Sequence, residues 1–236
     1  MPLIGKPSAL ARALILPCLL LTALAPLAPA RAELVVSQLI VELKPGSSRV
    51  QDVELLNDSP ERNYVSVEAR EMIEPGTARE RSAAPADPEK LGILVSPRRM
   101  ILEPGQRRML RIAALGPAIA QERVYRVTVK PVVGEVSGDT GLKLLVGYDL
   151  LVLVRPGAIQ SAVDADRRDN KLVIANRGNA SVELVDGKQC DFSGRSCREL
   201  PGKRLYAGAS FEQSLPSPNP GEYRVRSADG WSTVKF

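Results

Sequence analysis

The chain has 236 residues, of which 44% are hydrophobic and 25% charged, and its 32 basic and 27 acidic residues give a net charge of +5. It contains no histidine, which excludes Ser-His-Asp and Cys-His catalysis and removes the commonest metal ligand. No pair of acids stands out as a carboxylate catalytic site. The composition therefore argues against an enzyme, and we expect no catalytic residue, no metal and no cofactor.

Residues 1–32 have the order of a secretory signal peptide. Lys6 and Arg12 supply a positive start, residues 13–25 form an apolar run, and the Ala-Arg-Ala sequence at 30–32 provides the small residues of a cleavage site. We therefore expect cleavage after residue 32 and export of the mature chain.

Two other interpretations of this leader are weaker. A membrane anchor needs an apolar run of about 20 residues, and here Pro17 and Pro26 interrupt a shorter one. Cys18 could belong to a lipoprotein, but the preceding Leu16-Pro17 is a poor context for lipidation. No later segment is long and apolar enough to span a bilayer, so we expect no membrane insertion of the mature chain.

Loss of the leader changes the charge and leaves one cysteine pair. Three basic residues and no acidic residue leave with it, so that the net charge falls from +5 to about +2. This balance, without aromatic residues clustered among basic ones, gives no reason to expect a nucleic acid partner. Cys190 and Cys197 remain, and in an exported protein such a pair predicts a structural disulfide.

Short β-rich stretches, separated by Pro, Gly, Asn and Asp, dominate the first part of the mature chain. None of them shows a sustained helical period, so the pattern predicts an antiparallel β-sandwich. Residues 74–92 are polar and are expected to form an exposed loop. The expected strands are 34–43, 50–56, a run that begins at 64–67, 93–95, 108–113 and 123–133.

The segment 142–154 is the most informative one. Alternate positions place an unbroken set of apolar or aromatic side chains on one face of a strand, and the second half is apolar on both faces, as a central core strand should be. Thirteen residues is well above the usual strand length of about 5–6. The pattern alone leaves open an ordinary long core strand. The residues of the continuous face are Leu142, Leu144, Val146, Tyr148, Leu150, Val152 and Val154.

Arg155-Pro156-Gly157 ends this strand and predicts a domain boundary, because proline cannot continue a β-ladder. We expect a first sandwich domain over 33–156 and a smaller one over 157–236. The expected strands of the second domain are 171–175, 181–185, 204–215 and a hairpin over 222–236 that turns at Asp229-Gly230.

A family resemblance rests on several motifs in order. Residues 95–106 read V-S-P-R-R-M-I-L-E-P-G-Q and continue to L-R-I at 110–112. This resembles the P-x-R-x-x-L-E-P-G-x-x-x-x-x-R stretch of the periplasmic pilus and fimbrial chaperones, the PapD-like family. The turn at 57–59, the strand over 121–131 and the apolar strand ending in Arg155-Pro156 match further elements. The second domain matches poorly in sequence, although its length is suitable.

The resemblance implies two immunoglobulin-like sandwiches in tandem and a non-catalytic function. Chaperones of this family hold pilus subunits, which lack one strand, by inserting alternating apolar side chains of their long strand into the open groove. An outer-membrane usher then receives the subunit. The side chains that would enter the groove are Leu142, Leu144 and Val146, with Tyr148 as a further candidate. Arg155 would join a buried ion-pair network that orients the domains, with Glu122 as its nearest acidic candidate.

One family site does not carry over. The familiar members anchor the carboxylate of the subunit's C-terminus with two basic residues, and the matching positions here are 38–40, which read Gln-Leu-Ile, and Leu151. Arg126 and Lys130, on the adjacent predicted strand, are candidate substitutes.

Two other functions remain as alternatives. An immunoglobulin-like pilus component or adhesin would stay in the fibre, but it would carry a free N-terminal donor extension, whereas here a strand follows the cleavage site almost directly. A periplasmic carboxylate-type hydrolase is disfavoured by the composition.

Overall fold

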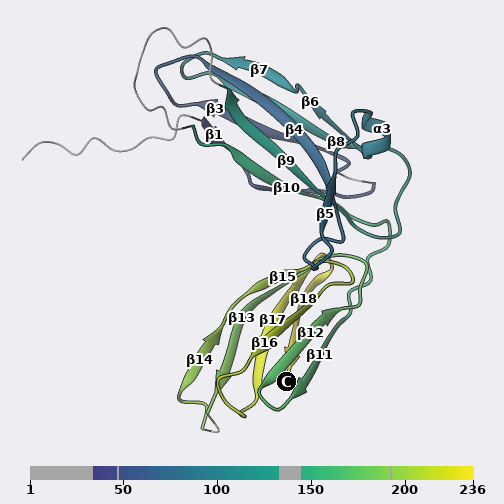
Figure 1. The fold of residues 1–236 in the computed structure, drawn as a ribbon, viewed down its shortest axis with the longest axis vertical. Helices are drawn as coiled ribbons and strands as arrows, with labels where there is room; N and C mark the ends of the chain where they lie inside the picture. The colour runs from purple at the N-terminus through teal and green to yellow at the C-terminus, as the bar shows by residue number, and fades with distance from the viewer. Residues whose placement is uncertain (1–33, 47, 133–144, 192) are drawn as a thin grey trace, which may run out of the picture. The chain divides into compact units, whose positions relative to one another are not determined.

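The computed structural model describes residues 34–46, 48–132, 145–191 and 193–236 and contains two β-sandwiches, in which all strand pairs are antiparallel except that of β2 with β10 (Figure 1). The predicted all-β, two-sandwich fold is thereby confirmed. The predicted signal peptide, together with Leu142 and Leu144, lies outside the described residues. No helix in the described part of the chain is long and apolar enough to cross a membrane.

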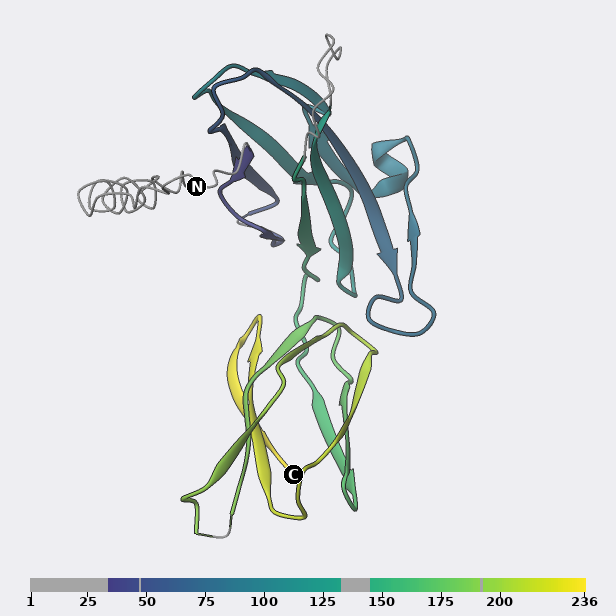
Figure 2. The same ribbon diagram turned by 60° about the vertical axis from the view of Figure 1, so that its left-hand side comes forward.

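The N-terminal sandwich consists of two sheets, which Figure 2 shows as two layers from a second direction. One sheet has the order β1-β3-β8-β6, formed by β1 (Leu34–Val36), β3 (Val50–Asn57), β8 (Arg107–Ala114) and β6 (Ile93–Ser96). The other has the order β2-β10-β9-β4-β5, with β7 also paired to β4. Its strands are β2 (Ile40–Leu43), β10 (Tyr148–Val154), β9 (Arg123–Val132), β4 (Asn63–Ile73), β5 (Arg81–Ala83) and β7 (Arg99–Leu102).

Alternation along the strands builds the core between these sheets. On β8, Leu110 and Ile112 are fully buried. On β9, Val127 and Val129 are fully buried, while Arg126 lies on the opposite face of the strand. Side chains one position apart point to opposite faces of a strand, so a period of two separates core from surface. Each such buried aliphatic side chain stabilises the fold by roughly 1.5–3 kcal/mol.

A buried asparagine joins two motifs that are far apart in the sequence. The Nδ2 of Asn57 donates to the carbonyl oxygens of Leu102 and Glu61, at 2.9 and 2.7 Å. Its Oδ1 accepts from the backbone N–H of Ser59. Gly105, with φ of 71°, makes the turn of the L-E-P-G motif and donates its N–H to the carbonyl of Asn57. The 57–59 turn and the L-E-P-G turn therefore support each other.

The C-terminal sandwich repeats this construction with fewer residues. One sheet, in the order β11-β12-β16, contains β11 (Val163–Arg168), β12 (Lys171–Asn176) and β16 (Ser210–Ser214). The other, β14-β13-β17-β18 with β15 on β13, contains β14 (Cys197–Leu200), β13 (Val182–Cys190), β17 (Gly221–Ser227), β18 (Gly230–Lys235) and β15 (Lys203–Leu205). Asn176 is the counterpart of Asn57, because its Nδ2 donates to the carbonyls of Ala180 and Leu205.

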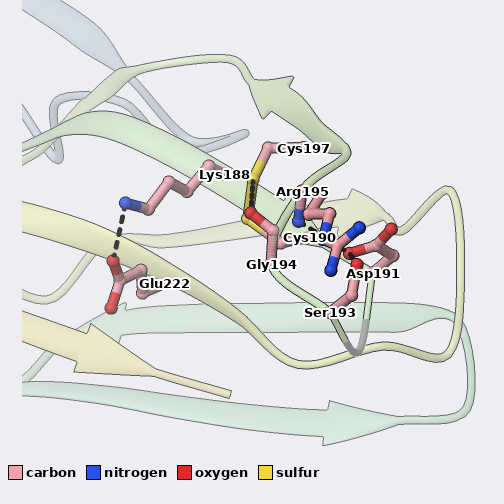
Figure 3. The surroundings of a disulfide bond; sticks show 8 residues. All are labelled: Lys188, Cys190, Asp191, Ser193, Gly194, Arg195, Cys197 and Glu222. Atoms are coloured by element: carbon pink, nitrogen blue, oxygen red, sulfur yellow. Dashed lines mark hydrogen bonds and ion pairs between the residues drawn. A yellow bond between two sulfur atoms is a disulfide. The ribbon is translucent and has the colours of Figure 1, made fainter.

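The predicted disulfide joins Cys190 and Cys197, which face each other across β13 and β14 (Figure 3). Beyond it, the Ser193 hydroxyl and the Arg195 N–H donate to the carboxylate of Asp191 and hold its pKa below the usual range. Closing so short a loop stabilises the fold by roughly 2–4 kcal/mol. The disulfide therefore cross-links the two strands of the β13–β14 hairpin next to its loop.

Two predicted strands are wrong in the same way. The stretch 34–43 forms β1 in one sheet and β2 in the other, and 204–215 forms the end of β15 and then β16, again in different sheets. In both cases the chain crosses from one layer to the other within a stretch that was predicted as a single strand.

The predicted loop at 74–92 is also only partly correct, because it contains β5 and the short helix α3 (Pro88–Leu91). Asp87 caps α3 by accepting from the N–H of Glu89, and Gly92 ends it with φ of 86°. Leu91 is buried, and its carbonyl accepts from the Tyr125 hydroxyl, so this segment is part of the core.

Candidate functional site

Strand β10 lies inside its sheet, pairing in parallel with β2 and antiparallel with β9. Leu150 and Val152 are fully buried in the core, Tyr148 is half-buried, and Val146 is 56% exposed. Exposure on this face therefore increases toward the start of the segment. The described strand begins at Tyr148, and residues 145–147 lie outside any strand, so the predicted thirteen-residue strand is wrong over those three positions.

The other face of β10 is apolar in its second half, as predicted. Leu151 and Leu153 are buried with Val124 of β9 in a second cluster, against which Met72 of β4 and Tyr206 pack. Tyr206 follows β15 of the C-terminal sandwich, and burial raises the pKa of its hydroxyl above the ordinary value. This apolar contact between the sandwiches was not predicted.

Tyr148 has a partner in its own sandwich. Its hydroxyl donates to the carbonyl of Leu34 on β1, at 2.7 Å, and its ring packs against the core. This bond links the two sheets at the start of β10. A subunit-binding role for Tyr148 stays a prediction, as it does for Leu142, Leu144 and Val146.

The structure brings Arg155 and Glu122 together in a buried ion pair. Arg155 is 3% exposed, and its Nη1 pairs with Oε2 of Glu122 and donates to the hydroxyl of Ser181. Its Nη2 donates to Oε1 of Glu42 at 2.8 Å. Partial burial works to raise the pKa of Glu42, but the hydrogen bond and charge of Arg155, with Lys44 and Arg204, outweigh it and lower that pKa.

Further hydrogen bonds join the same region to the C-terminal sandwich. The Glu122 carboxylate accepts from both the N–H and the hydroxyl of Ser181, at 3.2 Å each. The N–H of Glu122 donates to the carbonyl of Asn179, whose side chain in turn donates to the carbonyls of Ala120 and Ala158. The arrangement satisfies buried polar groups of both sandwiches at once.

The two candidate substitutes for the carboxylate anchor lie on the outer face of β9 and already contact carboxylates. Arg126 is 3.9 Å from Asp149, and Lys130 pairs with Glu68 at 2.7 Å. Arg70 of β4 lies beside Arg126 in the register and also pairs with Asp149, at 3.1 Å. Arg70 was not predicted from the sequence, because only the pairing of β4 with β9 places it beside Arg126.

No protein-family model matches the chain, and neither does any curated protein sequence. The class 5 fimbriae chaperone CfaA aligns with 86% of this chain and 98% of its own, at 21% identity and a TM-score of 0.66. The chain has the fold of the fimbrial chaperones.

Two further structures agree. The Escherichia coli chaperone DraB shares 20% identity and a TM-score of 0.58, over 86% of this chain and 96% of that chain. A chain from the complex of Salmonella enterica SafA pilin with the SafB chaperone shares 20% identity and a TM-score of 0.60, over 89% of this chain and 98% of that one. The alignments extend over almost the whole of these relatives, so the likeness covers both sandwiches.

Proposed function

We propose that this chain is a periplasmic chaperone for pilus or fimbrial subunits, which it holds by lending them a β-strand and delivers to an outer-membrane usher. The observation that carries the proposal is the shared fold over at least 96% of each of the three chaperone chains described above. Structures of that fold include one solved with a pilin and one solved with a tip adhesion subunit. The ordered sequence motifs point to the same family.

Strand donation fits the sequence pattern of the segment that leads into β10. An incomplete sandwich needs a strand that supplies backbone hydrogen bonds and apolar side chains on one face. Leu142, Leu144 and Val146 provide such a face, and the exposure of Val146 means that filling a groove would cover apolar surface that is in water in the free chain. Leu150 and Val152 hold the same strand in its own core.

The charged groups have supporting roles in this proposal. The network of Arg155, Glu122 and Glu42 would fix the orientation of the two sandwiches, because it joins groups of both. Arg126 or Lys130 would anchor the carboxylate of the subunit's C-terminus. In that case each would exchange its present contact with Asp149 or Glu68 for the carboxylate of the subunit.

The experiment is periplasmic co-expression with the pilin-type subunit that we expect to be encoded beside this gene. The chain should co-purify with the subunit in a one-to-one complex and protect it from proteolysis, whereas the subunit alone should be degraded. Leu144→Asp should abolish capture, because a carboxylate cannot enter an apolar groove without a large desolvation cost.

The matched control is Leu145→Asp, which makes the same change on the opposite face of the segment and should leave capture intact. Equal capture by Leu144→Asp and the wild type would contradict strand donation by this face. A pilus component or adhesin, the alternative function, would instead be recovered as part of the fibre.

A further inference from the structure

One sheet of the C-terminal sandwich ends on an open strand. In the order β14-β13-β17-β18, the strand β18 (labelled in Figure 1) pairs with β17 on one side, and no strand of the described residues pairs with its other side. Residues 161–163 and 232–234 line a common hollow of about 190 Å³, so the middle of β18 borders a hollow and not a further strand. An open edge of this kind presents a row of free backbone donors and acceptors.

The pairing with β17 decides which backbone groups of β18 are free. Gly221 and Phe236 exchange both N–H···O bonds, at 3.0 Å each, and are therefore a hydrogen-bonded pair of the ladder. Such pairs alternate with non-hydrogen-bonded ones, and the register of the two strands has no bulge. The N–H and C=O groups of Trp231, Thr233 and Lys235 therefore point to the open edge, and they have no backbone partner in the described part of the chain.

The side chains of these three residues share the outer face of the sheet. They alternate with Val234, which packs against the core of the sandwich. Trp231 is 58% exposed, and the guanidinium carbon of Arg224 lies 4.5 Å from its ring centroid. Lys235 is exposed as well.

Trp231 and Lys235 are complementary but cannot meet within one chain. An exposed indole ring attracts an ammonium group over its face. Four residues of extended strand separate the two Cα atoms by about 13 Å, so the contact has to come from another molecule.

We propose that β18 pairs with β18 of a second copy of this chain, antiparallel and with Thr233 on the two-fold axis. Each residue with free backbone groups then gains a hydrogen-bonded partner, and Trp231 lies directly opposite the partner's Lys235. The symmetry repeats this contact, so that each indole ring receives one ammonium group. Any other two-fold register pairs fewer of the free groups and separates Trp231 from the partner's Lys235.

The proposed dimer is independent of the proposed chaperone function, because it uses no residue of the segment that leads into β10. A strand of six residues buries less surface than a standard interface does, so we expect reversible association that requires high protein concentration.

The test is sedimentation equilibrium of the chain without its leader, from micromolar to millimolar concentration, with the tryptophan emission recorded in parallel. Trp231 is the only tryptophan of the chain, so the emission reports on this strand alone. We expect a monomer–dimer equilibrium and a change of emission that follows the fraction of dimer. A chain that stays monomeric throughout, or a dimer that leaves the emission unchanged, would overturn the proposal.

Thr233→Pro should abolish the dimer, because proline removes the N–H donor at the centre of the pairing. An edge position whose N–H faces solvent tolerates proline, and circular dichroism checks that the variant folds. Thr233→Val is the matched control, since it keeps the N–H and the side-chain shape and should dimerise like the wild type. Dimerisation of the proline variant, or its loss in both variants, would contradict pairing through the backbone.

Lys235→Gln tests the side-chain contact and does not depend on the folding of the proline variant. It removes two symmetry-related cation–π contacts and should raise the dimer dissociation constant by about tenfold. Lys188→Gln removes the same charge from β13 of the same sheet, where Lys188 pairs with Glu222 at 3.1 Å, and should leave the constant unchanged. Equal dissociation constants for Lys235→Gln and the wild type would refute the proposed register.

Discussion

Replacing Arg155 with alanine should lower the free energy of unfolding by about 3–5 kcal/mol. The reason is the partner left behind: the Glu122 side chain is only 1% exposed and would keep a buried charge whose remaining side-chain partner is the Ser181 hydroxyl. Glu42 would lose its 2.8 Å bond as well. Urea unfolding, monitored by circular dichroism, measures the change.

The control for this prediction is an exposed pair. Lys171 and Glu212 are bound at 2.9 Å, but both side chains are more than half exposed, so Lys171→Ala should leave the free energy of unfolding nearly unchanged. If Arg155→Ala were as mild as Lys171→Ala, the buried network would not hold the sandwiches in place.

Leu150→Ala should be similarly severe, with a loss of about 2–5 kcal/mol of unfolding free energy. Leu150 is fully buried on β10 opposite Val127 of β9, so its removal leaves a cavity in the core of the N-terminal sandwich. Val146→Ala lies on the same face of the same segment, where the side chain is 56% exposed, and should change stability by at most roughly 0.5 kcal/mol. Equal losses for the two variants would mean that position 146 belongs to the core.

Much of the fold follows from local sequence pattern. The strands β3, β8, β9 and the β17–β18 hairpin lie where alternation predicts them, because a period of two is a local property. The hairpin turns at Ala228-Asp229, one residue before the predicted Asp229-Gly230, because Ser227 pairs with Gly230. The sheet to which a strand belongs is not a local property. At 37–39 and 206–209 the chain changes layers, and because each crossing is short and contains no proline, each run was predicted as one strand.

The candidate site, too, could be predicted from the sequence only in part. Arg155 and Glu122 come from the family resemblance, and the apolar alternation toward Leu150 is visible in the sequence. Glu42 could not be assigned as a partner of Arg155, because the parallel pairing of β2 with β10 brings together residues 113 positions apart. Arg70 could not be predicted for the same reason, since only the β4–β9 register places it beside Arg126.

Strand donation is tested most directly by one triple variant, Leu142→Ala/Leu144→Ala/Val146→Ala. Its unfolding free energy and its retention of the co-expressed subunit are measured side by side with the wild type. We expect wild-type stability together with loss of the subunit, because the three side chains fill a partner's groove and contribute little to the chain's own core. A variant that unfolds far more easily would make the segment an ordinary core strand, and one that folds and still binds at wild-type affinity would place the binding surface elsewhere.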